Sequence, residues 1–189
     1  SIMTFNLDVE YDRPYIKMTG HNFDDASGNG NGRPEGGETV NLIITLSNLR
    51  IDADDAVLTA VADTNAVNFS DNASSWDVIP GFGSSDNSHD PITFSLPEGF
   101  GINWITFDLH FSSDGGTYER DFEITILSGV PNTVIIDDDN GDDIETYYIS
   151  TMEQTNMPFD VWDINAQGRI GNHLLDYTTA IWFTGNHSS

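Results

Sequence analysis

The segment ITFDLHFSSDGGTYERDFEITI, residues 105–126, indicates the fold class most directly. Apolar residues take every second position before the turn-forming run at 113–116, and the same alternation resumes after it. Alternate side chains of a β-strand point to opposite faces, so this pattern predicts a hairpin with one buried face. The apolar positions are Ile105, Phe107, Leu109, Phe111, Tyr118, Phe122, Ile124 and Ile126.

The chain before this hairpin has the same alternation, broken by turn-rich loops. The clearest strand there is 40–47, in which Val40, Leu42, Ile44 and Leu46 occupy alternate positions. Weaker strand candidates lie at 15–23, 56–62, 67–69 and 92–96. About seven short strands with no helical stretch between them predict a mainly β chain, with an antiparallel sandwich over residues 1–130.

A different pattern begins after Pro131. Residues 133–136 form a short all-apolar strand, and apolar residues then recur at helical spacing over 142–156. Two further strands are expected at 159–164 and 179–184, with a short helix or turn at 171–177 between them. We therefore expect a parallel β-α-β-α-β segment over residues 131–189. Three strands are few for an α/β domain, so we expect this one to be truncated.

The charge of the chain is strongly negative: 31 Asp and Glu residues against 6 Lys and Arg residues give a formal net charge of −25. Such a chain repels itself unless it binds cations, and it disfavours a nucleic-acid partner. Cysteine is absent, which excludes disulfides and thiolate metal ligands. No apolar run approaches the roughly 18 residues of a membrane span, so membrane insertion is not expected.

The loop DDASGNGNGRPEGGE, residues 24–38, alternates oxygen-bearing side chains with small residues. Calcium needs this arrangement, because it takes six to eight oxygen ligands and glycines let the chain turn tightly around the ion. Counting Ser27 as the first position of a twelve-residue calcium loop puts Glu38 at the last. The predicted metal ligands are Asp24, Asp25, Ser27, Asn29, Asn31, Arg33 through its carbonyl, and Glu38.

Two features depart from the usual calcium loop: Ser27 stands where Asp is usual, and a strand rather than a helix follows. The alternative interpretation is a solvated, flexible loop whose carboxylates only keep the chain soluble.

A second acidic cluster follows the 133–136 strand, at the edge where open α/β sheets place their ligand sites. One hypothesis is a second cation site formed by Asp137, Asp139 and Asp142. Another is structural, with Asp142 or Asp143 capping the following helix. A third is phosphoryl transfer, because Asp137-x-Asp139 resembles the motif of haloacid-dehalogenase phosphatases. Such an enzyme needs a lysine against the phosphate, and the only lysine of the chain is Lys17, in the other predicted domain.

Two resemblances extend these expectations. Residues 24–38, continuing into TVNL at 39–42, resemble the acidic opening of immunoglobulin-like domains in large secreted bacterial peptidases. The runs VIIDDDNG (134–141), ETYY (145–148), FDVWD (159–163) and IWFTG (181–185) resemble the flavodoxin-like or amidotransferase-like accessory domain that often follows that module. The resemblances imply a seven-stranded immunoglobulin-like sandwich, a flavodoxin-like second domain and an extracellular or cell-surface location. They supply no catalytic residue.

We therefore expect a non-catalytic, calcium-stabilised spacer or interaction module of a secreted multidomain bacterial protein, such as a peptidase. Its partners would be the neighbouring domains of that protein, and an exposed sheet edge at 181–183 predicts a homodimer. One alternative is the non-catalytic front part of a hydrolase whose active site is completed downstream. Another is adhesion to a polysaccharide, with sugar rings stacked on aromatic residues. The candidate aromatic residues are Trp76, Phe82, Trp104, Trp162 and Trp182.

Overall fold

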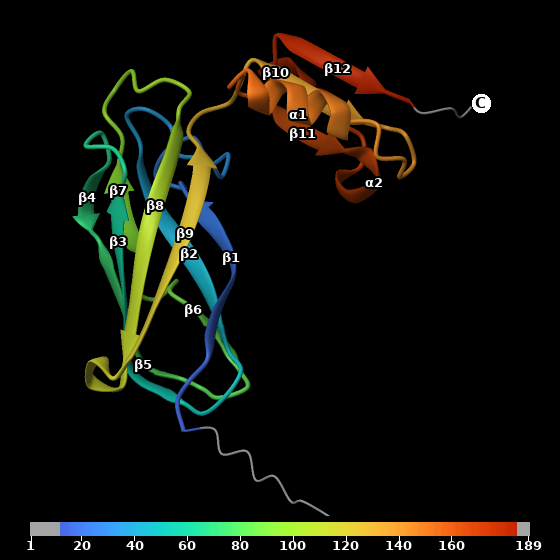
Figure 1. The fold of residues 1–189 in the computed structure, drawn as a ribbon. Coiled ribbons are helices and arrows are strands. Elements are labelled where there is room, and N and C mark those ends of the chain that lie inside the picture. Colours follow the sequence, from blue (N-terminus) through green and yellow to red (C-terminus); the bar gives the residue numbers. More distant parts are fainter. Residues whose placement is uncertain (1–11, 185–189) are drawn as a thin grey trace, which may run out of the picture. The chain divides into compact units, whose positions relative to one another are not determined.

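The computed structural model describes residues 12–184, which form two compact units (Figure 1). The first unit contains the chain up to Phe100 together with Ile105–Ile126. The second contains Gly101–Trp104 and the chain from Leu127 onward. Strands make up most of the regular structure, so the chain is mainly β. None of the described helices has the length and apolar character needed to cross a bilayer.

One sheet of the first unit has five antiparallel strands. Its order is β1-β2-β7-β4, and β6 also pairs with β2. β2 lies in the middle because it pairs with β1 along one edge and with β7 and β6 along the other, and its alternate residues Val40, Leu42, Ile44 and Leu46 are all fully buried on the inner face. The strands are β1 (Ile16–Asp24), β2 (Thr39–Asn48), β4 (Asn68–Asp71), β6 (Ser84–Asp86) and β7 (Ile92–Ser95).

The other sheet of this unit has four strands in the order β5-β3-β8-β9. β3 pairs antiparallel with both β5 and β8. The predicted hairpin is confirmed: β8 and β9 are neighbours, joined by the short 3-10 turn η1 (Asp114–Gly116). The strands are β3 (Ala53–Ala62), β5 (Ala73–Ile79), β8 (Trp104–Ser113) and β9 (Tyr118–Leu127).

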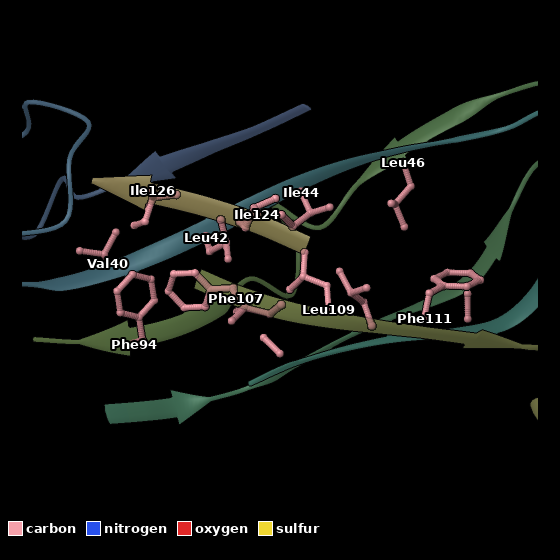
Figure 2. Close-up of a cluster of buried hydrophobic side chains, with 14 of the residues drawn as sticks. Val40, Leu42, Ile44, Leu46, Phe94, Phe107, Leu109, Phe111, Ile124 and Ile126 are labelled. Carbon is pink, nitrogen blue, oxygen red and sulfur yellow. The ribbon is translucent and has the colours of Figure 1, made fainter. Parts of the chain in front are cut away.

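A single hydrophobic core joins the inner faces of these two sheets (Figure 2). Phe94 of β7 and Phe107 of β8 come from different sheets, and their ring centroids lie 5.2 Å apart. Ile124 and Ile126 of β9 pack into the same cluster. The first unit is therefore a sandwich of two sheets closed by alternate apolar residues, as the sequence predicts.

The expected count of seven strands is not met, because the described part of this unit has nine. The two additional strands are β5 and β6. In β5 the buried positions are Ser74, Trp76 and Ile79, so polar and unevenly spaced residues replace the apolar alternation. β6 has three residues, Ser84–Asp86, and none of them is apolar. Pairing with β3 and β2, rather than hydrophobic pattern, makes these segments strands.

The second unit contains a three-stranded parallel sheet in the order β11-β10-β12. Its central strand β10 has both faces covered, and Val134, Ile135 and Ile136 are fully buried. This burial explains the continuous apolar run in the sequence. The elements are β10 (Thr133–Asp137), α1 (Thr146–Gln154), β11 (Asp160–Asp163), α2 (Ile164–Gln167), the 3-10 helix η2 (Gly171–Asp176) and β12 (Thr179–Phe183).

The first helix of this unit is shorter than the predicted span 142–156, because α1 begins only at Thr146. The residues before it form an acidic loop that Asp139 holds away from helical geometry. A further short helix, α2, was not predicted. Asp163 caps it, since its Oδ1 accepts hydrogen bonds from the backbone N–H groups of Asn165 (2.7 Å) and Ala166 (3.2 Å).

Candidate metal centre

Three carboxylates converge where β10 ends and α1 begins. Oxygen atoms of Asp137, Asp139 and Glu145 all lie within 4.8 Å of one another. Asp137 is the last residue of β10, and Glu145 directly precedes α1. Among residues 12–184, no other group of three His, Cys, Asp or Glu side chains is this close. The group has the size and the chemistry to hold a metal ion.

The loop between the strand and the helix is folded around Asp139, which is fully buried. Its carboxylate accepts hydrogen bonds from the backbone N–H groups of Gly141 (3.0 Å) and Ile144 (3.4 Å). Asn140 and Gly141 both have positive φ, of 63° and 97°, which brings the chain sharply back towards the carboxylate. This turn places Glu145 beside the end of β10, although eight positions separate it from Asp137.

The electrostatics of this group are unfavourable without a cation. Burial, a hydrogen bond with Asp139 and the negative charges of Asp139 and Glu145 raise the pKa of Asp137, against an opposing hydrogen bond from the Asp139 backbone. Glu145 Oε2 is buried and has no hydrogen-bond partner. A buried carboxylate oxygen without a donor is costly, and a bound cation would remove that cost.

This cluster differs from the predicted one in its third member. Asp137 and Asp139 are brought together as expected, but Asp142 is exposed and lies outside the group. Glu145 takes its place. The sequence reasoning missed Glu145 because it assigned residues 142–145 to the helix. The signal that could have identified it is Gly141, which permits the tight turn that carries the next carboxylate back to the strand.

The predicted calcium loop at 24–38 is organised around Asp25, which is 3% exposed. The Asp25 carboxylate accepts hydrogen bonds from the backbone N–H groups of Asn31 (3.0 Å) and Gly32 (3.1 Å). The side-chain oxygens of Asn29 and Asn31 accept hydrogen bonds from the N–H groups two residues further on, at 2.9 Å each. These oxygens face the backbone of the same loop, so the loop is folded by its own hydrogen bonds.

The remaining predicted ligands surround this centre unevenly. Glu38 Oε1 accepts a hydrogen bond from the Asn29 N–H (3.0 Å), while Glu38 Oε2 is buried without a partner. Ser27 donates its hydroxyl hydrogen to the Thr39 carbonyl (2.9 Å), and Asp24 accepts from the Ala26 N–H (3.1 Å). Arg33 is half-buried. The loop therefore gathers the predicted residues in one place without bringing three carboxylates into ligand distance of one another.

The aromatic residues suggested for sugar stacking lie in different environments. Trp76 is 5% exposed, and its Nε1–H donates to the Asp86 carbonyl (2.9 Å) inside the sandwich, so it offers no face to a ligand. Trp104 and Trp182 are about half exposed, at 46% and 48%, but they belong to separate elements. Phe82 is 75% exposed in the loop between β5 and β6.

Comparison with known proteins assigns no family to this chain. No family model matches it, and no curated protein matches it. Among solved structures, it is similar to a family 123 glycoside hydrolase from Clostridium perfringens whose structure concerns glycolipid glycan hydrolysis. The two are 9% identical with a TM-score of 0.36, and the match covers 66% of this chain and 30% of that one. So weak a similarity assigns neither fold nor activity.

Proposed function

We propose that this chain is a non-catalytic, calcium-stabilised module of a secreted multidomain protein. The observation that carries this proposal is the convergence of Asp137, Asp139 and Glu145, one of which, Glu145, has a buried carboxylate oxygen without a hydrogen-bond partner. Calcium is the ion that suits the group best, because it prefers carboxylate oxygens and tolerates irregular geometry. Its millimolar extracellular concentration would keep a weak site filled.

The sandwich supplies the spacer part of this proposal. Its strand order β1-β2-β7 in one sheet and β5-β3-β8-β9 in the other supports an immunoglobulin-like arrangement, in which strands A-B-E and C′-C-F-G occupy these positions. Such modules hold neighbouring domains apart. The charge of −25 supports a cation-rich extracellular setting, where bound and diffuse cations reduce self-repulsion.

Calcium would act by linkage, since it binds the folded site and not the unfolded chain. At concentrations 100 to 1,000 times the dissociation constant, one site adds about 3 to 4 kcal/mol to the free energy of unfolding. The loop at 24–38 would form a second, separate site of the same kind. The two sites lie in different units, so their contributions can be measured separately.

The test is thermal unfolding in chelator, then with calcium or magnesium restored, in the wild type and in Glu145→Gln. We expect calcium to raise the unfolding midpoint by several degrees and magnesium to raise it less. Glu145→Gln keeps the shape of the side chain but removes its charge, so it should abolish most of the calcium effect that belongs to the second unit. Glu38→Gln tests the loop at 24–38 in the same way.

The matched control is Asp142→Asn, which removes a charge from the same loop outside the cluster. It should leave the calcium response unchanged. If Asp142→Asn and Glu145→Gln reduce the calcium-induced rise in midpoint equally, calcium only screens the general negative charge. If calcium leaves the unfolding midpoint of the wild type unchanged, the proposal is overturned.

A further inference from the structure

The second unit contains a cavity of about 560 Å³ on the side of the sheet where strands β10 and β12 end. This is a general position for ligands in open parallel sheets, where connections leave neighbouring strands towards opposite faces. The cavity is separate in its lining from the candidate metal centre, since none of Asp137, Asp139 and Glu145 contributes to it. Its walls include Asp138, Ile164, Arg169, Ile170, Leu174 and Trp182.

Trp182 is held in place at this cavity although it is half exposed. Its Nε1–H donates a hydrogen bond to Asp138 Oδ2 at 3.0 Å. β12 is fixed to β10 on either side of Trp182, because Ile181 pairs with Ile135 and Phe183 with Asp137. An aromatic ring that is both exposed and fixed loses little conformational freedom when a ligand packs against it. Ile164, Ile170 and Leu174 supply further apolar surface.

Arg169 supplies the only Lys or Arg side chain of the second unit, against ten Asp and Glu residues. It is exposed, and it forms no hydrogen bond or ion pair with any residue in the described range 12–184. Arg169, the one permanently positive side chain of this unit, thus lies on the wall of the cavity. It is close in sequence to the apolar residues that line the same wall. The opposite charge on the wall is Asp138.

We propose that this cavity binds a small zwitterion with an apolar body, of the class of an apolar amino acid or dipeptide with free termini. Its carboxylate would pair with Arg169, its ammonium group with Asp138, and its side chains would pack on Trp182 and Leu174. A ligand with net negative charge would be repelled by the ten carboxylates of this unit, and a purely cationic ligand would offer no carboxylate to pair with Arg169. A zwitterion can pair with both Arg169 and Asp138. Because its net charge is zero, the surrounding carboxylates do not repel it as a whole.

The test is a titration of the whole chain with the dipeptide Leu-Phe, followed by calorimetry and by tryptophan fluorescence. We expect saturable binding with a change in fluorescence, because Trp182 contacts the ligand. N-acetyl-Leu-Phe-amide has the same apolar body without charges, and it should bind at least tenfold more weakly. Arg169→Gln should weaken Leu-Phe binding by a similar factor and leave the unfolding midpoint unchanged, since Arg169 has no partner in the described structure.

Asp138→Asn is the sharper variant, because the amide oxygen still accepts the Trp182 hydrogen bond while the negative charge is lost. It should weaken the binding of Leu-Phe more than the binding of N-acetyl-Leu-Phe, which keeps the carboxylate but has no ammonium group to pair with Asp138. Arg120→Gln, in the other unit, is the control and should leave the binding of Leu-Phe unchanged. Absence of saturable binding at millimolar Leu-Phe would overturn the proposal, as would equal binding of the free and blocked dipeptides. Neither result bears on the metal centre, whose test is the calcium dependence of unfolding.

Discussion

Asn87 is a buried amide that links the two sheets of the sandwich. Its Oδ1 accepts a hydrogen bond from the Ile44 N–H of β2 (2.6 Å), and its Nδ2 donates to the Leu42 carbonyl (3.1 Å) and to Ser74 Oγ of β5 (2.8 Å). Asn87 is fully buried, so removing its amide leaves these partners in a region that is screened from water. Asn87, a polar residue in the loop after β6, therefore helps to hold the two sheets together.

Replacing Asn87 by Ala should lower the free energy of unfolding by about 3 kcal/mol, because it leaves buried polar groups without partners. Urea unfolding followed by circular dichroism measures this loss. Asn68→Ala, at an exposed position of β4, is the control and should change stability by less than about 0.5 kcal/mol. Similar losses in both variants would contradict the role of Asn87.

Tyr15 is surrounded by half of the Lys and Arg residues of the chain. The Lys17, Arg50 and Arg120 charges lie 5.9, 5.4 and 4.8 Å from the centre of its ring. A hydrogen bond from Arg120, followed by the charges of Arg120, Lys17 and Arg50, lowers the pKa of Tyr15. A lowered pKa in the folded state means that phenolate formation stabilises the fold above the ordinary tyrosine pKa, and that this stabilisation is lost as the pH falls through the folded-state pKa.

Arg120→Gln should therefore raise the pKa of Tyr15 towards its ordinary value. Ultraviolet titration of tyrosine ionisation, as a difference between each protein and its Tyr15→Phe counterpart, isolates this one group. Arg33→Gln is the control, since Arg33 does not contribute to the shift. A Tyr15 pKa that stays lowered in Arg120→Gln would show that Lys17 and Arg50 are sufficient.

At the scale of elements, the loop between β5 and β6 fits closely against the β2–β3 connection at Gly81. A Cβ atom at this position would lie 2.2 Å from the Arg50 carbonyl oxygen. Gly81 N–H also donates to Asp52 Oδ1 at 2.7 Å, which fixes the approach of the two loops. No side chain fits here unless the backbone of one loop moves.

Gly81→Ala should lower the free energy of unfolding by about 2 kcal/mol through this overlap. Gly20→Ala is a matched control, because Gly20 has no heavy atom within 4 Å of the added Cβ and lacks a positive φ. The two midpoints in thermal unfolding give the comparison. Equal unfolding midpoints would mean that the β2–β3 connection moves to accommodate the added Cβ atom without loss of stability.

The elements that the sequence predicts well are those whose alternation is both regular and apolar. β2 and β8 follow this rule, and their inward residues Leu42 and Phe107 are fully buried. β5 does not, since Ser74 takes an inward position and its hydroxyl accepts the hydrogen bond from Asn87. Glu145 shows the same limit at the candidate site, because its place depends on how the chain turns at Gly141 rather than on its spacing from Asp137.

At the scale of the whole molecule, the two units have separate hydrophobic cores. Leu58 belongs to the core of the sandwich, while Val134 and Ile136 belong to that of the parallel sheet, and all three are fully buried. The second core is much smaller, with three buried members against the 21 of the first. The second unit is therefore expected to open more readily.

Leu58→Ala and Ile136→Ala should each cost about 2 to 5 kcal/mol within their own unit. Hydrogen exchange measured by mass spectrometry distinguishes the opening of the two units. Ile136→Ala should accelerate exchange at 133–183 and leave β2 and β8 protected. Leu58→Ala should accelerate exchange in β2 and β8 and leave 133–183 protected. Faster exchange throughout the chain in both variants would show that the units unfold together.

The positions of the first and last strands of the sandwich determine how it bears tension. The chain enters at the start of β1 and leaves at the end of β9, which lie at opposite ends of the sandwich and in different sheets (Figure 1). A pull on the two ends runs along these strands and shears them against β2 and β8. β1 is paired with β2 from Ile16 to Asp24, apart from a register shift between Met18 and Gly20, so a pull along the strands loads several backbone hydrogen bonds at once. We therefore expect the sandwich to resist a pull applied between the start of β1 and the end of β9.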